Sequence, residues 1–492
     1  MKVDSIVIVG GGTSGWLTAA YLCNNHPGLS ITIIDKEVGT PVGVGEGTLL
    51  QIGAFLSECG FEFSEWFPAV DATYKSAILF ANWQSQGKDI WHPFYKGNIV
   101  VDDETNLYDV WSQVQELDFK KIAMAYYESS VLYNSVDANN LSNYGYHIDC
   151  SKLVYFIQQK LKNKVKLIKS EVIDIVYTDE NISNLKLKND EHIPADLFVD
   201  CTGFKSLLKK TKKRVNLEGR LFCNTAIAGH IPYNDRNTEL RPYVISEAVD
   251  HGWIWNIPVT SRIGSGLVFN RNITDIEEAK DYFVEYWDNR ISKEDCKVID
   301  WTPFYNEDMW SGNTVCIGLS AGFIEPLEST GIALITSGVT QLSNAIRTQY
   351  YTKDDVDFFN LQMKIMFEDC VDFVSMHYAN NNRDTKFWSY VKNTWTPSKK
   401  MSHYLNKLAD SSVQIPSAGK FHSVFDGINW SIWLIQMGFL VAPRKTKYTE
   451  QEAENIVIDN YLKNEKYRYV WSRHHATEVD RLREYFNISN ES

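Results

Sequence analysis

The sequence predicts a mixed α/β fold, with a doubly wound parallel sheet interleaved with a second, largely helical module. Residues 3–35 show a short apolar run, a glycine turn, helical spacing and a second apolar run that ends in an acid. This order opens a doubly wound sheet. Buried-strand runs return at 196–200 and 315–318, and no Pro/Ser-rich linker divides the 492 residues. Two modules are therefore expected to interleave rather than follow one another.

The first turn carries glycines at the spacing that phosphate recognition requires. Gly10, Gly12 and Gly15 follow a strand and open a helix. The N-terminus of that helix can then meet a pyrophosphate at a turn where side chains would block the approach. Asp35 ends the second strand, where an acid accepts a ribose hydroxyl. The pattern predicts a dinucleotide site of Rossmann type and leaves NAD and FAD open.

Further glycine-rich turns follow other predicted strands. The segment 43–48 comes soon after the second strand and could wrap the flavin side of a dinucleotide, although an ordinary loop is the alternative. Residues 196–203 and 315–322 each form a buried strand that ends in small residues. Two such strand ends beside a dinucleotide site are typical of FAD folds. Each alone is equally consistent with a β-turn that binds nothing.

Lys75 lies in an otherwise apolar strand pattern. Residues 74–83 alternate, so Lys75, Ala77, Leu79, Ala81 and Trp83 are expected on one face. A lysine on such a face is unusual. The alternative is a strand-end lysine whose ammonium group reaches water.

Two tryptophans form a second pattern. In residues 252–258, Trp253, Trp255 and Ile257 point to one side of a strand, and Pro258 ends its pairing. The rings make either a flat wall beside a ligand or part of the core.

Residues 325–332 read Glu-Pro-Leu-Glu-Ser-Thr-Gly-Ile and precede a long apolar helical stretch. The backbone N–H groups near Thr330 and Gly331 are therefore expected at a helix N-terminus, where they attract small anions. Glu328 is either a functional carboxylate or a capping acid.

Composition excludes several classes of protein. The net charge of −13 opposes binding to nucleic acid or to anionic lipid. No stretch approaches the roughly 18 uncharged apolar residues of a membrane helix. No spacing suggests a metal site, since the neighbouring His474 and His475 cannot face one ligand on a helix. The 8 cysteines show no C-x-x-C pair and the N-terminus shows no signal pattern, so we expect a cytoplasmic protein.

Taken together, these motifs resemble the flavin-dependent halogenases, the family that contains the tryptophan halogenases. The resemblance rests on the glycine motif, Lys75, Trp253-x-Trp255-x-Ile257-Pro258 and the Pro-Leu-Glu-Ser-Thr-Gly run at 326–331, in the family's order. It extends to about residue 390 and then thins to scattered residues such as Trp430 and Trp433. That last region is where such enzymes shape their substrate pockets.

The resemblance implies an FADH2-dependent enzyme that uses O2 and chloride or bromide to form hypohalous acid, which halogenates an indole or phenol. A separate flavin reductase would supply the reduced cofactor. Lys75 and Glu328 would be the catalytic residues, Thr330 and Gly331 would bind halide, and no metal would be needed. The substrate side would comprise Trp253, Trp255, Ser329, Trp430 and Trp433. The expected FAD-binding residues are Gly10, Gly12, Thr13, Ser14, Gly15, Asp35, Gly45, Glu46, Gly203, Gly318 and Leu327.

The expected FAD-binding module covers residues 1–355, with interleaved substrate-side strands at about 70–110 and 240–300. Residues 356–492 form the expected helical substrate-binding module. We expect a monomer or homodimer that acts on a small aromatic molecule. An FAD-dependent monooxygenase of the same fold and a non-catalytic flavin-binding redox sensor are the alternatives.

Overall fold

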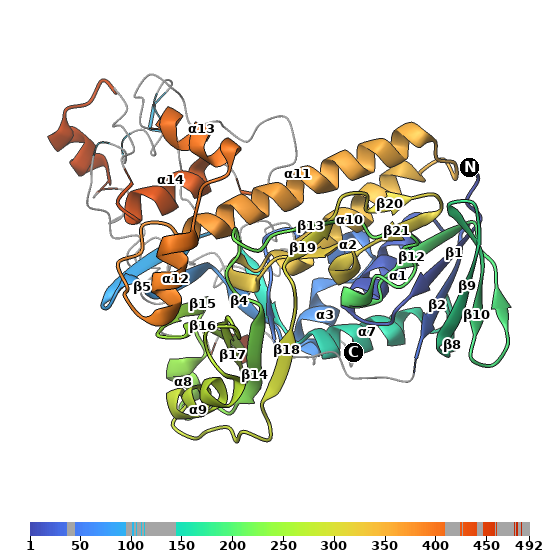
Figure 1. Ribbon diagram of the computed structural model, residues 1–492, viewed down its shortest axis with the longest axis horizontal. Coiled ribbons are helices and arrows are strands. Elements are labelled where there is room, and N and C mark those ends of the chain that lie inside the picture. The colour runs from blue at the N-terminus through green and yellow to red at the C-terminus, as the bar shows by residue number, and fades with distance from the viewer. Residues whose placement is uncertain are drawn as a thin grey trace. The chain divides into compact units, whose positions relative to one another are not determined.

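The computed structural model describes residues 1–36, 45–94, 144–408, 424–425, 427–439 and 446–457, with single positions at 101–102, 105, 110, 113, 459, 477, 479–480 and 484. It consists of two units that alternate along the chain (Figure 1). Unit 1 comprises Met1–Ala72, Ile148–Glu218 and Trp301–Glu368. Unit 2 comprises Thr73–His147, Gly219–Asp300 and Asp369–Ser492. The module boundary expected after residue 355 stays a prediction, and it lies inside the long helix α11 (Lys353–His377).

Unit 1 is built on the predicted doubly wound sheet. Its strand order is β20-β21-β12-β1-β2-β8. Strand β1 (Ser5–Val9) pairs in parallel with both β2 (Ser30–Asp35) and β12 (Leu197–Asp200). These strands are apolar because both faces of the sheet are covered. Helix α1 (Thr13–Asn25) contacts β1 and β2, and Val7, Val9 and Ile34 pack with Ile182 and Leu185 of an antiparallel strand. Helix α1 connects β1 to β2 and packs against α7 and α10 (Figure 1).

The other elements of unit 1 complete this sheet, cover it or form small antiparallel sheets beside it. The sheet strands are β8 (Lys166–Lys169), β20 (Trp310–Ser311) and β21 (Thr314–Cys316). The helices are α2 (Ile52–Glu58), α3 (Phe63–Ala69), α7 (Cys150–Leu161) and α10 (Thr330–Ala345). The smaller strands are β3 (Glu46–Gly47), β9 (Val172–Thr178), β10 (Asn181–Leu187), β11 (His192–Ile193), β13 (Arg214–Asn216), β19 (Phe304–Asn306) and β22 (Gly322–Phe323). Short 3₁₀ turns are η2 (Gly203–Lys205), η3 (Gly318–Ser320) and η4 (Pro326–Glu328).

Unit 2 is built on a seven-stranded sheet of order β18-β14-β17-β16-β15-β5-β6. All its neighbouring strands are antiparallel except β15 and β5. These strands are β5 (Ala77–Ser85), β6 (Lys88–Pro93), β14 (Thr225–Ile231), β15 (Tyr243–Val249), β16 (Gly252–Val259), β17 (Arg262–Phe269) and β18 (Lys297–Asp300). A separate pair joins β4 (Thr73–Lys75) to β7 (Gly145–Ile148). Helices are α8 (Arg236–Glu239), α9 (Ile276–Tyr286), α12 (Lys386–Thr394), α13 (Lys399–Leu408) and α14 (Gly427–Gln436).

The predicted single strand over residues 74–83 was wrong. Two strands occupy this range, because Ser76 leaves the pairing and its backbone N–H donates to the Pro242 carbonyl oxygen at 2.8 Å. A second irregularity follows at Asn82, which has φ 53°. Leu79 therefore packs with Trp91, whereas Trp83 packs against other aromatic rings on the opposite side. The expected common face is therefore interrupted, because Trp83 lies on the opposite side from Leu79.

The described residues contain no helix long and apolar enough to cross a membrane and no cluster of acidic, histidine or cysteine side chains suited to a metal. All eight cysteines are free thiols. The His474–His475 pair lies outside the described residues.

Candidate active site

The first glycine turn is packed against its own chain at two positions and open at a third. Gly10 has φ +110°, and a Cβ there would lie 2.3 Å from the carbonyl oxygen of Cys201. A Cβ on Gly15 would lie 2.0 Å from the carbonyl oxygen of Gly10. A Cβ on Gly12, in contrast, would meet no atom within 4 Å. The turn therefore leaves room for a ligand at Gly12.

Helix α1 starts directly beside this open space. Its N-cap is Gly12, which has no side chain to bond the first amides, and its first turn, from Thr13, holds no acidic residue. The positive end of the helix dipole is thus available to an anion. Free amides, a helix N-terminus and an open cradle are what a pyrophosphate needs. These residues fit the dinucleotide that the sequence predicts.

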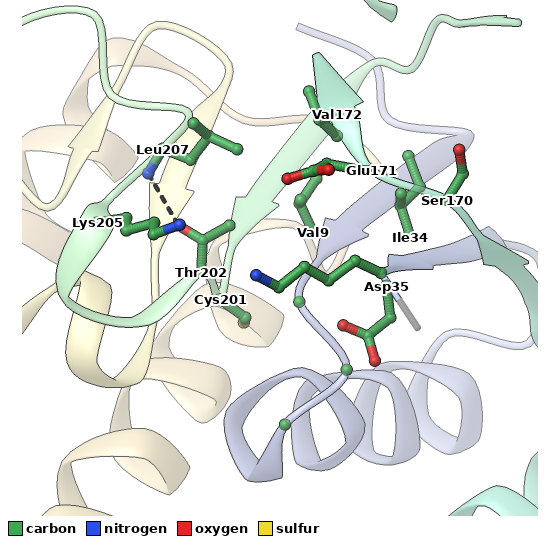
Figure 2. A pocket seen from close by; sticks show the side chains of 14 residues that line it. Val9, Ile34, Asp35, Ser170, Glu171, Val172, Cys201, Thr202, Lys205 and Leu207 are labelled. Atoms are coloured by element: carbon green, nitrogen blue, oxygen red, sulfur yellow. Dashed lines mark hydrogen bonds between the residues drawn. The ribbon is translucent and has the colours of Figure 1, made fainter. Parts of the chain in front are cut away.

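A pocket of about 290 Å³ opens at the ends of β1, β2 and β12 (Figure 2). Figure 2 shows the Asp35 carboxylate at the end of β2, directed toward the glycine turn. Asp35 accepts a hydrogen bond from the Gly11 backbone N–H, and a Cβ on Gly11 would lie only 2.5 Å from Asp35 Oδ2. Burial raises the pKa of Asp35, and the Gly11 hydrogen bond opposes this rise. The carboxylate thus lies at the end of β2, where the sequence predicts a ribose-binding acid.

The turn after β12 is held by the buried carboxylate of Asp200. Asp200 Oδ1 accepts hydrogen bonds from the Thr202 backbone N–H and hydroxyl at 2.9 and 2.6 Å. Its Oδ2 accepts from the Leu208 N–H at 2.7 Å. Burial raises the pKa of Asp200 even though these three donors favour the charged form. Gly203 follows with φ +70° and open space where a Cβ would stand.

The turn after β21 lies on the first turn of α1. Gly318 has φ +77°, and a Cβ there would lie 2.7 Å from the Ser14 Cβ and 3.5 Å from a side-chain carbon of Ile335 in α10. A side chain at Gly318 would therefore clash with Ser14 in the first turn of α1, whereas its contact with Ile335 would be an ordinary one. Gly45 has φ 86° and precedes β3, which begins at the half-buried Glu46. The neighbouring residues 37–44, which include part of the predicted flavin loop, lie outside the described residues.

Helix α10 begins without a side-chain cap. Turn η4 ends at Ser329, which adopts the left-handed conformation with φ 58° and ψ 35° and makes no side-chain hydrogen bond to the helix. Leu327 and Glu328 are fully buried beneath this turn, at 1% and 0% exposure. Of the first two residues of α10, Thr330 is buried and Gly331 is exposed.

The start of α10 has room for a small anion. A Cβ on Gly331 would meet no atom within 4 Å, and Gly331 is exposed. Thr330 is 1% exposed, and within the part of the chain that the structure describes its Oγ1 has no hydrogen-bond partner. Two adjacent amides at a helix N-terminus, beside open space and a buried hydroxyl, suit a halide ion.

Lys75 ends β4 in unit 2 and has 0% exposure. Its Nζ lies 4.8 Å from the centroid of the Phe94 ring, within cation–π range. This burial excludes the alternative in which Lys75 extends its ammonium group into water. A fully buried lysine is rare in proteins and marks Lys75 as a functional candidate.

Trp253 and Trp255 lie on one side of β16, with ring centroids 6.2 Å apart. Trp253 is fully buried and its Nε1–H donates to the Tyr378 hydroxyl at 3.1 Å. Trp255 is 7% exposed. Both rings therefore belong to the core of unit 2.

The two tryptophans of α14 differ in accessibility. Trp433 is fully buried, and its ring stacks on His377 with centroids 3.6 Å apart. Trp430 is partly exposed and meets the Phe373 ring edge-on at 5.1 Å. Phe373 in turn stacks on Phe425 at 4.1 Å. Of the two predicted substrate-side rings, only Trp430 offers a surface to a ligand.

The sequence predictions did not include three groups around Lys75 and the glycine turn. Thr73 and His147 bond to one another on the strand pair that carries Lys75. Gly11 is a variable position of the G-x-G-x-x-G motif, but here it packs closely against Asp35. The tight pairing of strand β2 with β1 could have indicated Gly11, but no local pattern points to His147.

Comparisons with known proteins identify the family. The family model described as tryptophan halogenase matches residues 5–454. The chain belongs to the tryptophan halogenase family. It is 31% identical to tryptophan 6-halogenase SttH of Streptomyces toxytricini, over 84% of this chain and 86% of that protein. It is 30% identical to tryptophan 6-halogenase ThaL of Streptomyces albogriseolus, over 79% of this chain and 78% of that one.

Solved structures show the same fold. The crystal structure of SttH from Streptomyces toxytricini superposes with a TM-score of 0.83 at 27% identity, covering 97% of this chain and 100% of that one. A flavin-dependent halogenase from Xanthomonas campestris gives a TM-score of 0.86 at 24% identity, covering 98% and 99% of the two chains. This halogenase is therefore a flavin-dependent enzyme with the Rossmann-type fold that the sequence predicts.

Proposed function

We propose that this halogenase uses reduced FAD, O2 and chloride or bromide to form hypohalous acid, and that it transfers the halogen to an electron-rich ring such as an indole or phenol. The observation that carries the proposal is the completely buried Lys75. Burial of a lysine amine carries a desolvation cost, and a fully buried lysine is therefore a candidate for a functional role.

The glycine turn, Asp35 and the start of α1 hold FAD in the proposal. Gly12 leaves space for the pyrophosphate, the α1 amides bind it, and Asp35 binds the ribose. Reduced FAD supplies two electrons to O2, so that O2, halide and protons become hypohalous acid and water. The chain's own task in this step is to bind and orient the reactants and to exclude other water.

The backbone amides of Thr330 and Gly331 hold the halide. Their place at the N-terminus of α10 favours an anion by about 0.3–1 kcal/mol when exposed and up to roughly 2 kcal/mol when partly buried. The hydroxyl group of the buried Thr330 adds a further polar atom beside this turn.

Lys75 guides the hypohalous acid to the ring. Its ε-amino group either donates a hydrogen bond to hypohalous acid or reacts with it, forming an N–halogen bond and releasing water. Transfer to the ring then breaks the N–halogen bond, or the O–halogen bond of hypohalous acid, and forms the carbon–halogen bond. The proton that the ring loses finally restores the amine, or converts the hydroxide left by hypohalous acid to water. Glu328, buried at 0% exposure, accepts that proton as a general base. The tryptophans of β16 keep the organic substrate from the oxidant.

Two variants test these roles. Lys75→Ala removes the amine and is expected to consume reduced flavin and O2 at the parent rate while forming no halogenated product. Glu328→Gln is expected to slow product formation at unchanged FAD affinity, because the amide cannot accept the ring proton. Mass spectrometry of product and an oxygen electrode give both quantities. Halogenation by Lys75→Ala near the parent rate would reject the role of Lys75.

A separate flavin reductase supplies the reduced cofactor in this proposal. The sequence has one glycine-rich dinucleotide fingerprint and no second one for NADPH. The purified protein with FAD should therefore oxidise NADPH only slowly until a reductase is added. Rapid NADPH oxidation by the pure chain would instead favour an FAD-dependent monooxygenase.

The substrate is proposed to be a simple indole or phenol without an amino-acid head group. Trp430 offers an aromatic surface, and no set of charged groups dedicated to an ammonium and a carboxylate is evident after residue 390 in the described sequence. Bromide should serve at least as well as chloride, since it is more easily oxidised. Competition between tryptophan and indole for limiting enzyme tests this. Preferential, single-position chlorination of tryptophan would contradict it.

A further inference from the structure

Helix α11 packs one side of its first turns into unit 1. The Phe359 ring meets the Trp310 ring edge-on, with centroids 5.4 Å apart, and the Phe367 ring lies 5.7 Å from that of Tyr305. Residues 353–368 of this long helix (Figure 1) belong to unit 1. A helix that buries one apolar side normally carries polar residues on the other.

The outer side of these turns is apolar as well. Phe358 is 55% exposed, Leu361 is 52% exposed, and Ile365 is partly exposed. Residues at i, i+3 and i+7 lie along one side of a helix, so the three side chains form a continuous stripe. Single apolar residues are common on protein surfaces, whereas a contiguous stripe indicates a contact with another molecule.

Two exposed charged residues, Asp357 and Lys364, run beside this stripe. Successive helical residues are about 100° apart around the axis. Seen from Leu361, the two charged residues therefore lie about 40–60° to one side. Phe358 and Ile365 lie about 40–60° to the other side. The outer face thus has a charged side and an apolar side, divided by Leu361.

A twofold axis at Leu361 matches this face to itself. In an antiparallel helix pair, such an axis stands perpendicular to the plane of the two helices, so each residue stays on its own side of the contact. Residues equally far from Leu361 in opposite directions come level. Asp357 is four residues before Leu361 and Lys364 is three after it, so each lies within about 1.5 Å of the level of the other in the second copy. The same holds for Phe358 and Ile365.

We propose that the outer face of α11 binds the same face of a second copy of this chain, in an antiparallel homodimer whose twofold axis passes Leu361. The apolar sides pack together, and two ion pairs between Asp357 and Lys364 of different copies fix the orientation. Lys364 is available for this, since it has no ion-pair partner among the described residues. A parallel arrangement would instead place the charged side of one helix on the apolar side of the other. The proposal is independent of the halogenation chemistry.

Sedimentation velocity at several protein concentrations measures the association. About four helical turns make a contact at the small end of interface sizes, so we expect a reversible dimer with a Kd of about 1–100 μM. Lys364→Glu opposes two carboxylates at both ends of the contact and should raise the Kd about tenfold or more. Asp357→Lys should do the same by opposing two lysines. The double variant Asp357→Lys/Lys364→Glu restores both pairs and should return the Kd to within about threefold of the parent.

Lys188→Glu is the matched control for the charge change. Lys188 is an exposed residue of unit 1 between β10 and β11, so this variant alters the net charge as Lys364→Glu does. Its Kd should equal that of the parent. Unchanged thermal unfolding of monomeric Lys364→Glu separates loss of the contact from loss of the fold.

A cross-link tests the position of the axis. Helix axes 8–10 Å apart leave about 4–5 Å between two Cα atoms that face each other across the axis, within reach of a disulfide. Mild oxidation should therefore link Leu361→Cys into a covalent dimer. Lys353→Cys is the control on the same helix, because the two copies of residue 353 would be about 24 Å apart, which no disulfide spans. The parent is the blank for the eight native thiols.

Three results would overturn the proposal. The first is a parent protein that stays monomeric at 100 μM and above, which would leave the α11 face to a different partner. The second is a dimer whose Kd neither single variant raises, or whose Kd the double variant fails to restore. The third is equal cross-linking of Leu361→Cys and Lys353→Cys, which would place the twofold axis elsewhere.

Discussion

Gly266 of β17 lies directly opposite Trp255 of β16, and the indole ring fills the space that a side chain on Gly266 would need. A Cβ at Gly266 would lie 2.2 Å from Trp255 Cη2 and 2.7 Å from the carbonyl oxygen of Ile227. The Trp255 ring can occupy this space on β17 because residue 266 is a glycine.

Gly266→Ala should displace the Trp255 ring and destabilise unit 2. Overpacking by one methyl group in a closed core costs about 1–3 kcal/mol of unfolding free energy. Urea unfolding measures this loss, and near-ultraviolet circular dichroism reports the displaced indole. An unchanged aromatic spectrum with parent stability would show that the ring is not held by this contact.

Substitutions at Gly12 and Gly10 should have opposite consequences. Gly12 has φ −79° and open space around it, so Gly12→Ala should fold normally but obstruct the pyrophosphate. Loss of charge-assisted hydrogen bonds worth about 1.5–3 kcal/mol corresponds to roughly a ten- to hundredfold loss of FAD affinity. Flavin fluorescence titration measures this affinity.

Gly10→Ala is the matched comparison. Its φ of +110° and the Cys201 carbonyl oxygen at 2.3 Å leave no place for a methyl group. The backbone would have to shift, so the variant should lose more than about 2 kcal/mol of unfolding free energy. If Gly10→Ala is as stable as the parent while Gly12→Ala is not, the packing described for the turn is incorrect.

Acid should weaken FAD binding through Asp35. Burial raises the pKa of this carboxyl above its ordinary value of 3.8. The charged form accepts the ribose hydroxyl and the protonated form loses that acceptor, so FAD affinity should fall as the pH drops through the raised pKa and recover above it. Asp35→Asn should bind FAD more weakly at neutral pH and should lack this pH dependence. Identical pH profiles for the two proteins would exclude Asp35 as the titrating group.

Gly331→Ala should impair halide use without affecting FAD. The methyl group would enter the open space beside the first amides of α10 and would not strike the protein. An anion interaction of about 1.4 kcal/mol, within the range for helix N-termini, corresponds to a tenfold rise in the KM for halide. The rise should be larger for bromide than for chloride, because bromide is the larger ion. Equal KM values in parent and variant would place the halide elsewhere.

Much of unit 1 could be predicted because its signals are local. The glycine turn, the helix that follows it and the acid at the end of β2 form one continuous stretch whose geometry depends on few other residues. In unit 2, Thr449 and Glu452 form a capping box that is equally local, with hydrogen bonds of 2.8 and 3.3 Å between the two residues. Such features follow from backbone sterics and hydrogen bonding within a few residues.

The tertiary structure alone decided the surroundings of Lys75. An alternating pattern shows which side chains share a face of one strand, but it contains no information about where pairing stops or which strand becomes the partner. The chain leaves β4 at Ser76 because Pro242, far along the sequence, accepts its hydrogen bonds. That break separates Lys75 from Leu79 and pairs it with a strand that carries Gly145 and His147. The sequence by itself determined the family, the fold class and the choice of Lys75 as a candidate functional residue. Contacts between distant segments determined what surrounds Lys75, because strand register is set by packing and not by local preference.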